Sequence, residues 1–375
     1  MSFNQYTWDL YKQTTIGIEM IKYFSDAGGY VSFKDYCPYA NFIPEDLYND
    51  WLENIYCYGV SDYDHPSSLE EAKDLYISLI TLGIRVEGQQ WLPANDFKNM
   101  LGIIQPMSYV LSQFAPEYFF PYLFLCRIFE LNKIADFFNI DLPNIPKRTD
   151  YKGRCMYYWE LCEVFYLFRK ENGLSPADLW SFLYDFAPNN LPSEKIDMPK
   201  PSQVWFIGGR LYQEDKSLES KFWQSSPETK KGDILVHYET SPISAITCIE
   251  ISLTDGVIDP LFRYYGCIYI GNRINIPHIT LKELQTDEYF FKHPLVRKNF
   301  QGVNGWSVNS ENYSELLRMI KTKGFDIEVL PKLYAPTLPK DVIIEYEHDV
   351  EQQLLEPLLN SMGWYENKDF IRQLP

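Results

Sequence analysis

Two clusters of proline divide this chain of 375 residues and limit how its parts can fold. The first, PNNLPSEKIDMPKPS, begins at Pro188, and the second, LPKLYAPTLPKD, begins at Leu330. Proline lacks a backbone N–H and disfavours helix in the residue before it, so neither cluster fits inside a long helix or a central strand. At roughly 100–200 residues per domain, the length favours two or three domains. We therefore expect three parts: 1–190, 202–330 and 341–375.

The first part, 1–190, has the patterns of a helical domain. Ser67-Ser68 precede two glutamates by three residues, which is a capping box, and Ser175-Pro176 opens a second helix that Pro188 should end. The helices that we predict lie at 16–28, 68–83, 155–170 and 175–188, with short strands around 85–92. Aromatic residues make up 17% of the whole chain, and in this part we expect them to form the core.

After residue 201 the pattern changes to β-branched and aromatic runs separated by turns. The strands that we predict lie at 204–212, 234–240, 243–252 and 264–274, followed by a helix from Ser310 to Gly324. The fold class is therefore α+β: a helical N-terminal domain, then a small mixed β-barrel with flanking helices. A final amphipathic helix is predicted over 348–362.

Charge and cysteine content narrow the partners and the compartment. The formal net charge is -17, which argues against a protein that coats polyanions, but 201–340 hold 16 basic and 16 acidic residues. The seven cysteines form no CxxC pair, which suits a reducing cytoplasm. The N-terminus lacks a signal-peptide pattern, and charged residues and prolines interrupt the most apolar stretch, 109–131. We expect a cytoplasmic protein with no membrane partner.

Established catalytic motifs are absent from the sequence. There is no phosphate loop, GxSxG elbow, HExxH or GxGxxG, and the five histidines have no metal-ligand spacing. We therefore expect this chain to hold no cofactor or metal and to be non-catalytic by itself. An enzyme whose active site lies in the helical part is a remaining alternative.

The middle part contains two strings that point to a family. GDILVHYETSPISAITCIEI (232–251) and KELQTDEYFFKHPLVRKNFQG (282–302) resemble the EVE domain of the PUA-like superfamily, which is similar to the YTH readers of modified adenine in RNA. KFWQSS (221–226) looks like the YTH segment in which a tryptophan precedes small polar residues. The resemblance covers about 202–324 and implies a PUA-like barrel that binds a flipped, modified base.

Reading an extruded base requires a flat stacking face and polar groups for its edge. Trp223 is the first stacking candidate and Trp306 the second, with Trp205 and Tyr238 behind them because both lie in strand patterns. The edge-reading candidates are Gln224, Ser225, Thr240, Ser241 and Asn304. The phosphate-contact candidates are Arg210, Arg273, Arg297 and Lys298. For each ring the alternative is an ordinary place in the core.

The C-terminal part, EYEHDVEQQLLEPLLNSMGW followed by KDFIRQ, is similar to the first helix and strand of the nuclease domain in type I restriction subunits, which belong to the PD-(D/E)XK superfamily. By position, Glu347 corresponds to the first-helix acid of that family. The resemblance implies a nuclease that continues past Pro375 and would use Mg²⁺ in a full-length protein. The alternative is a plain amphipathic helix.

Together these features predict the reader module of a modification-dependent restriction factor in a prokaryotic defence system. We expect a nucleic-acid partner, modified DNA before RNA. The helical part is a candidate for homo-oligomerisation, DNA contact or partner sensing. An RNA reader is the first alternative, and a regulatory protein whose barrel binds a small metabolite or a protein is the second.

Overall fold

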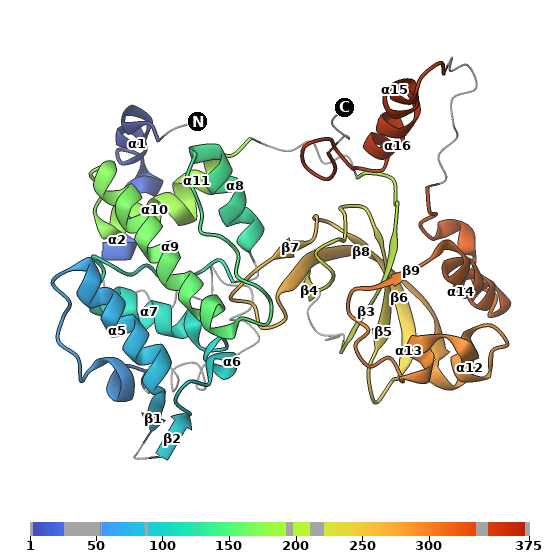
Figure 1. Cartoon of the computed structure of the whole chain (residues 1–375), viewed down its shortest axis with the longest axis horizontal. Coiled ribbons are helices and arrows are strands. Elements are labelled where there is room, and N and C mark those ends of the chain that lie inside the picture. Colours follow the sequence, from blue (N-terminus) through green and yellow to red (C-terminus); the bar gives the residue numbers. More distant parts are fainter. Residues whose placement is uncertain are drawn as a thin grey trace. The chain divides into compact units, whose positions relative to one another are not determined.

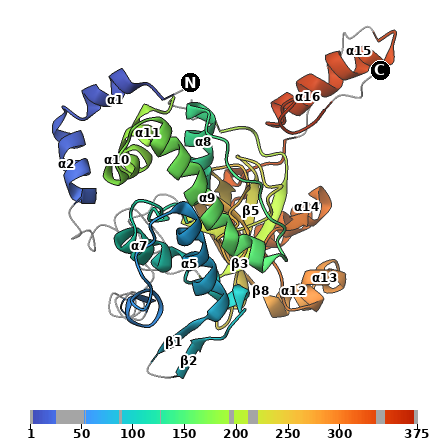
Figure 2. The same ribbon diagram turned by 60° about the vertical axis from the view of Figure 1, so that its left-hand side comes forward.

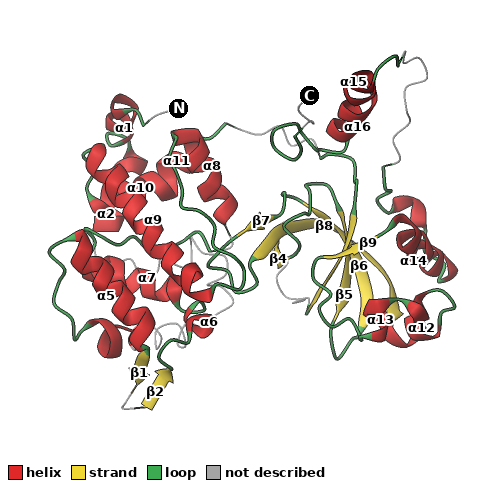
Figure 3. Cartoon of the chain, in the orientation of Figure 1, coloured by secondary structure: helices red, strands yellow, loops and turns green. Residues whose placement is uncertain are grey.

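The computed structural model describes residues 3–25, 53, 55–86, 89–125, 127–192, 198–210, 221–334 and 344–371. The chain forms two compact units, one of residues 1–194 with 258–265 and one of residues 195–257 with 266–375 (Figure 1). Helices make up most of the first unit, and a curled sheet organises the second, so the fold is α+β (Figure 3). Within the described ranges, no helix is both long enough and apolar enough to cross a bilayer.

The first unit is built around the longest helix, α9 (Tyr151–Glu171), which packs beside α5 (Leu69–Leu82) in both views (Figures 1 and 2). A small hairpin of β1 (Ile84–Val86) and β2 (Gln89–Leu92) matches the short strands predicted there. The other elements are α1 (Gln5–Tyr11), α2 (Thr15–Ser25), the π-helical turns η2 (Tyr56–Val60) and η3 (Phe182–Phe186), α6 (Phe97–Met100), α7 (Ile104–Phe114), α8 (Ile128–Phe138), α10 (Pro176–Ser181) and α11 (Ala187–Asn190). Its largest fully buried side chains are mainly aromatic, as the composition predicts.

The segment Ile258–Tyr265 groups with the helical unit, although the sequence analysis placed it inside the middle domain. Arg154, buried in α9, donates hydrogen bonds to the carbonyls of Pro260 and Phe262 at 2.8 and 2.7 Å. Asp259 is fully buried and accepts from the backbone N–H of Leu261 at 2.9 Å. These bonds make the segment an integral part of the helical core.

The second unit contains a seven-stranded sheet curled into a half-barrel. Six strands follow the order β4-β8-β6-β5-β3-β9, and the short β7 pairs with β8. Only β3 and β5 pair in parallel; the other described pairs in the order are antiparallel. The strands are β3 (Val204–Gly209), β4 (Lys221–Gln224), β5 (Ile234–Glu239), β6 (Ala245–Ser252), β7 (Val257–Ile258), β8 (Gly266–Thr280) and β9 (Trp306–Val308).

The two faces of the sheet bury different clusters. One face packs on the helices and contains Phe206, Val236 and Ile249. The other face joins Trp205 and Ile207 of β3 to Ile268 of β8. Because β3 and β8 are not neighbours in the sheet, their contact identifies this second face as the concave side. The covering elements are α12 (Leu281–Thr286), η4 (Phe290–Lys292), α13 (Pro294–Arg297), α14 (Ser310–Thr322) and η5 (Ile327–Val329).

A C-terminal helical stretch follows, made of α15 (Glu347–Val350), η6 (Glu351–Leu355) and α16 (Glu356–Ser361). None of these residues is buried, so the apolar face predicted over 348–362 is not enclosed by the described part of the chain. The following turn attaches to the second unit: Lys230 pairs with Asp369 and lies 4.7 Å from the ring centre of Trp364, and Lys368 bonds Asp255 at 2.9 Å.

Two predicted helix boundaries are wrong by one or two residues. Pro188 does not end its helix, because it stands in the first turn of α11, where its missing N–H is not needed. Asn309, rather than Ser310, caps α14 by accepting from the N–H of Asn312 at 2.7 Å. The predicted caps at Ser68 and Ser175 are confirmed, and Ser175 with Asp178 forms a complete capping box.

Candidate functional site

The concave face of the half-barrel is polar near the carboxyl end of β5. Alternation along β5 directs Leu235 and His237 to this face, and their pairing with Glu250 and Cys248 places those side chains beside them. Towards the start of β5 the same face is apolar, with Trp205 and Leu235 in one cluster. We call the two ends of the half-barrel the Asp233 end and the His237 end, after residues near the start and the finish of β5.

Trp223 lies at the His237 end and spans the opening between the sheet edges. It sits on the edge strand β4, but its ring reaches β3: a Cβ added to Gly209 would lie 2.6 Å from its Cζ2 atom. The ring is half-buried and meets the imidazole of His237 edge-on, with centroids 4.7 Å apart. The curl of the sheet therefore brings the first stacking candidate onto a polar cluster.

Asn304 fixes the orientation of that indole. Its Oδ1 accepts from Trp223 Nε1 at 3.2 Å and from the backbone N–H of Gly208 at 2.8 Å, and its Nδ2 donates to Gln224 at 3.4 Å. Trp223, Gln224 and Asn304, all predicted site residues, thus come together. Because the Asn304 oxygen already accepts two hydrogen bonds from the protein, this residue orients the indole and does not offer a free oxygen to a base edge.

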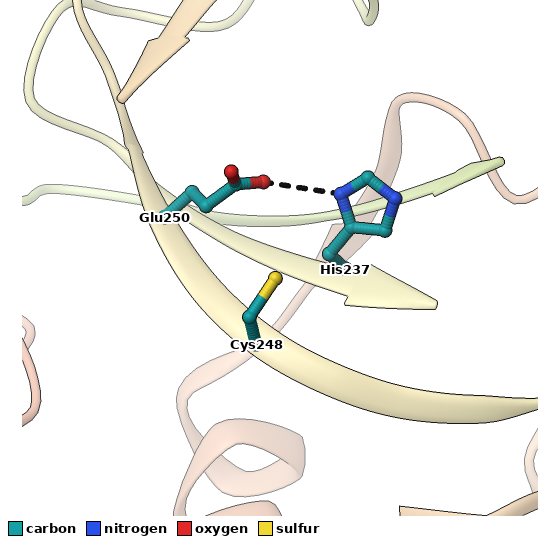
Figure 4. Close-up of side chains that lie close together, drawn as sticks. All are labelled: His237, Cys248 and Glu250. Atoms are coloured by element: carbon teal, nitrogen blue, oxygen red, sulfur yellow. Dashed lines mark hydrogen bonds and ion pairs between the residues drawn. The ribbon is translucent and has the colours of Figure 1, made fainter. Parts of the chain in front are cut away.

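A buried chain of hydrogen bonds lies beneath the indole. His237 Nδ1 and Glu250 Oε2 are 3.0 Å apart, and the other Glu250 oxygen accepts from Arg273 Nε at 2.8 Å (Figure 4). Burial acts to raise the pKa of Glu250, but the hydrogen bonds that it accepts from His237 and Arg273, together with the charge of the Arg273 guanidinium, outweigh burial and lower the pKa below its usual value. Glu250 is therefore an ionised acceptor, and His237 Nδ1 carries the proton between them.

Cys248 completes a group that has the residue types of a metal site. Its sulfur and ligand atoms of His237 and Glu250 all lie within 4.8 Å of one another (Figure 4). Burial, above all, raises the pKa of Cys248 to about 12, so the thiol is neutral. Arg273 already compensates the carboxylate charge, and a guanidinium at this distance opposes a cation. The chemistry of these side chains favours a hydrogen-bonded chain over metal binding.

At the Asp233 end, the protein's own side chains satisfy the polar groups. Asp233 accepts from Trp205 Nε1 at 2.9 Å and from the backbone N–H of Lys230 at 2.8 Å. Burial is the main reason that the pKa of Asp233 is raised, against these hydrogen bonds. The turn that holds Trp364 and Asp369 attaches at Lys230. Trp205, a weaker stacking candidate, is 3% exposed and is a core residue of this end.

Three other predicted base contacts lie outside the His237 end. Tyr238 is buried on the helix-covered face and stacks on Phe300 at 4.0 Å, so both its faces are unavailable to a base. Trp306 pairs with Phe206 and packs on that same face, opposite Trp223, so the two tryptophans do not form one cage. Ser225 is buried, with its hydroxyl 3.0 Å from that of Thr229.

The remaining predicted residues are exposed or engaged. Thr240 and Ser241 are exposed in the β5–β6 turn, and the N–H of Thr240 donates to Gly209 at 3.2 Å, next to the site. Arg210 is exposed directly after β3. Arg273 is committed to Glu250 at 2.8 Å. Arg297 and Lys298 are exposed at the end of α13, and Glu347 is exposed at the start of α15; Arg372 and Gln373 lie outside the described residues.

The sequence analysis missed His237, which it treated as structural, and the Gly208-Gly209 pair. The glycines give a recognisable signal, because two of them at the end of a strand mark a close approach of other atoms. A Cβ on Gly208 would lie 2.4 Å from the Val303 side chain. His237 and Glu250 are also polar residues in otherwise apolar strands, which is the pattern of a buried polar pair.

Comparison with known proteins adds little to this geometry. No protein-family model matches the chain, and no curated protein matches it. A solved structure, the NMR structure of Rpa0253 from Rhodopseudomonas palustris, is similar over 32% of this chain and 94% of its own, with 14% identity and a TM-score of 0.28. A likeness at that score carries no argument about fold or function.

Proposed function

We propose that this chain is a reader of modified nucleobases, with an EVE-type, PUA-like barrel, in a modification-dependent restriction system. The observation that carries the proposal is the half-buried indole of Trp223, held by Asn304 beside a buried polar chain at the His237 end. A fixed aromatic face is what stacking on an extruded base requires, and such stacking contributes about 1–3 kcal/mol per base.

The partner that we propose is modified DNA. Arg210 and Thr240 are exposed and flank Gly209, against which the indole packs, and their position supports the proposal that they contact the nucleic-acid backbone and a base edge. The proposed reader would direct an attached Mg²⁺-dependent nuclease in which Glu347 is the first-helix acid. That second part rests on the sequence resemblance of the C-terminal segment alone.

Binding titrations with the full chain test the proposal. The probes are DNA oligonucleotides, single-stranded and duplex, that carry one 5-methylcytosine, 5-hydroxymethylcytosine or N6-methyladenine, with unmodified and RNA counterparts. We expect a preference of about 10-fold or more for one modified DNA, as stacking plus edge contacts allow. Equal affinity for modified and unmodified probes would refute the proposal, and a preference for modified RNA would move it to an RNA reader.

Two tryptophan variants form a matched pair for this titration. Trp223→Ala should remove the preference for the modified base, whereas Trp306→Ala, a half-buried tryptophan of the opposite face, should retain it. Because Trp223 also bridges β4 and β3, Trp223→Phe supplies a milder variant that should reduce the preference without unfolding the protein. An unchanged preference in folded Trp223→Ala protein would show that the indole only closes the barrel.

A further inference from the structure

One ring nitrogen of His237 is buried, and the described part of the chain gives it no partner. The side chain is fully buried, and Nε2 has no hydrogen-bond partner among the described residues. Most buried polar atoms in proteins are satisfied, so an exception calls for a specific reason. Figure 4 shows this nitrogen turned away from Glu250, the partner of the other ring nitrogen.

The chain of hydrogen bonds determines what Nε2 can do. Ionised Glu250 cannot donate, so the proton between it and His237 lies on Nδ1. Arg273 already balances the charge of Glu250, and a protonated ring would add an uncompensated buried charge. The neutral ring with its proton on Nδ1 leaves a lone pair on Nε2. This nitrogen is therefore a hydrogen-bond acceptor with a fixed orientation.

The imidazole that carries this acceptor is in contact with the indole of Trp223, with the ring centroids 4.7 Å apart. The planes of the two rings are inclined by 65°. A base stacked parallel to the indole would meet the imidazole at the same steep angle and would present its edge to it. Cys248, the neighbour on β6, is a neutral thiol and does not compete as a strong acceptor.

We propose that His237 determines specificity by accepting a hydrogen bond through Nε2 from an N–H group on the edge of the bound base. This inference rests on the proposed function of the same site. The ligand class that it names is an uncharged base with an exocyclic amino or monomethylamino group, as in 5-methylcytosine or N6-methyladenine. A site that leaves a buried acceptor unpaired discriminates strongly against an analogue that lacks the donor.

Blocking the donor provides the central experiment. Oligonucleotides with one N6-methyladenine or 5-methylcytosine are compared with counterparts that carry N6,N6-dimethyladenine or N4,N4-dimethyl-5-methylcytosine, which have no exocyclic N–H. We expect the block to weaken binding to the full wild-type chain by about 10-fold or more. Since added methyl groups also change shape, the same comparison is made with His237→Phe, where the effect of the block should fall below about 3-fold.

Two further variants complete the design. His237→Gln retains an amide that can donate to Glu250 and still offer an oxygen acceptor, so it should keep part of the donor dependence. His278→Gln changes an exposed histidine on β8 and should behave as wild type. Thermal unfolding of each variant identifies any that fails to fold.

The outcomes separate the two proposals. If a modified probe is preferred but His237→Phe and wild type respond equally to the block, the reader function stands and the role of His237 is refuted. If no probe is preferred, both proposals fail. Nitrogen NMR of the histidine rings is carried out on the wild-type chain and so does not depend on the folding of any variant. An unprotonated Nε2 on His237 supports the inference, and a protonated Nε2 overturns it.

Discussion

The Asp233 end and the His237 end of the half-barrel contain similar residue types but differ in how their hydrogen bonds are arranged. Each has a tryptophan and a buried carboxylate: Trp205 and Asp233 at one end, and Trp223 and Glu250 at the other. A basic residue bonds each carboxylate, Lys230 through its backbone N–H and Arg273 through its guanidinium. At the Asp233 end the carboxylate binds the indole directly, and the C-terminal turn attaches there. At the His237 end the indole is bound by Asn304, and one buried nitrogen has no described partner.

The difference indicates how a structural end of the half-barrel can be distinguished from a candidate binding end. Burial alone does not separate them, because both are rich in buried polar side chains. What differs is whether the described residues use all the hydrogen-bonding capacity of the buried polar groups. A complete set of partners stabilises the fold, and an incomplete set leaves an interaction for a ligand.

The largest effect that we expect is on stability, at the Asp233 end. Asp233→Ala removes the acceptor of Trp205 Nε1 and of two backbone N–H groups, and should lower the free energy of unfolding by about 3 kcal/mol. Urea unfolding measures the loss. Asp326→Ala, which removes one exposed cap at the start of η5, should cost less than about 1 kcal/mol. A loss of oligonucleotide binding by folded Asp233→Ala protein would contradict the division between the ends.

Ionisation of Glu250 and of Asp233 should also change the stability of the fold with pH in opposite directions. The folded pKa of Glu250 is lowered from 4.5, so its stabilisation is present above pH 4.5 and is lost as pH falls through the folded value. The folded pKa of Asp233 is raised from 3.8, so its contribution is fully present below that pH and is lost as pH rises through the folded value.

Unfolding of Glu250→Gln and Asp233→Asn between about pH 3 and 6 checks these signs. The free energy of unfolding of Glu250→Gln should lie below that of wild type near neutral pH, and this deficit should shrink as the solution becomes more acidic. For Asp233→Asn, the deficit in the free energy of unfolding relative to wild type should instead become larger at acidic pH. We expect the differences of the two variants from wild type to change in opposite directions across this range. Parallel curves for the two variants would show that the ends are electrostatically alike.

A smaller effect should follow from closing the space at the His237 end. Gly209→Ala places a Cβ 2.6 Å from Trp223 Cζ2, so the indole must move away from Asn304. We expect a loss of about 1–2 kcal/mol in stability and a weaker preference for modified DNA. The indole N–H resonance of Trp223 in an NMR spectrum would report the broken bond. Gly59→Ala, where the nearest atom lies at 3.6 Å, is the control that should change little.

The smallest effects concern salt. Since 201–340 are net neutral, few phosphates should be neutralised, and the logarithm of affinity against that of salt should have a slope shallower than about -6. Arg210→Ala, beside the site, should reduce this slope by about 1, whereas Arg297→Ala should leave it nearly unchanged. An equal change for both would indicate that nucleic acid also contacts the end of α13.

Local signals explain which parts of the fold were predictable. Ser175, Pro176 and Asp178 act within one turn, so the sequence predicts their capping box, and strands β5 and β6 follow from apolar runs. The parallel pairing of β3 with β5 is not local, and neither is the reach of Trp223 from β4 to β3. These depend on the curl of the whole sheet, which no short pattern contains.

The same reasoning applies to the site. The search for stacking rings and edge-reading groups selected Trp223, Gln224 and Asn304, which the fold brings together. It also selected Tyr238 and Trp306, which face the helices. The alternation of side chains along a strand could have separated the residues of the concave face from those of the helix-covered face only if the pairing register of the strands had been known. His237 had no motif to mark it, because its role depends on a partner thirteen residues away on β6.

The segment from Ile258 to Tyr265 decides how this protein can be dissected. In a fragment that contains only the barrel, Leu261 and Phe262 would be exposed to water, because the helical unit that buries them would be missing. Two neighbouring exposed apolar side chains on a loop would favour aggregation. Replacing those eight residues with a short polar turn is therefore the first step in any attempt to produce the barrel by itself. Arg154 would then need replacement in the helical fragment, since its guanidinium would be left without the carbonyls that it binds.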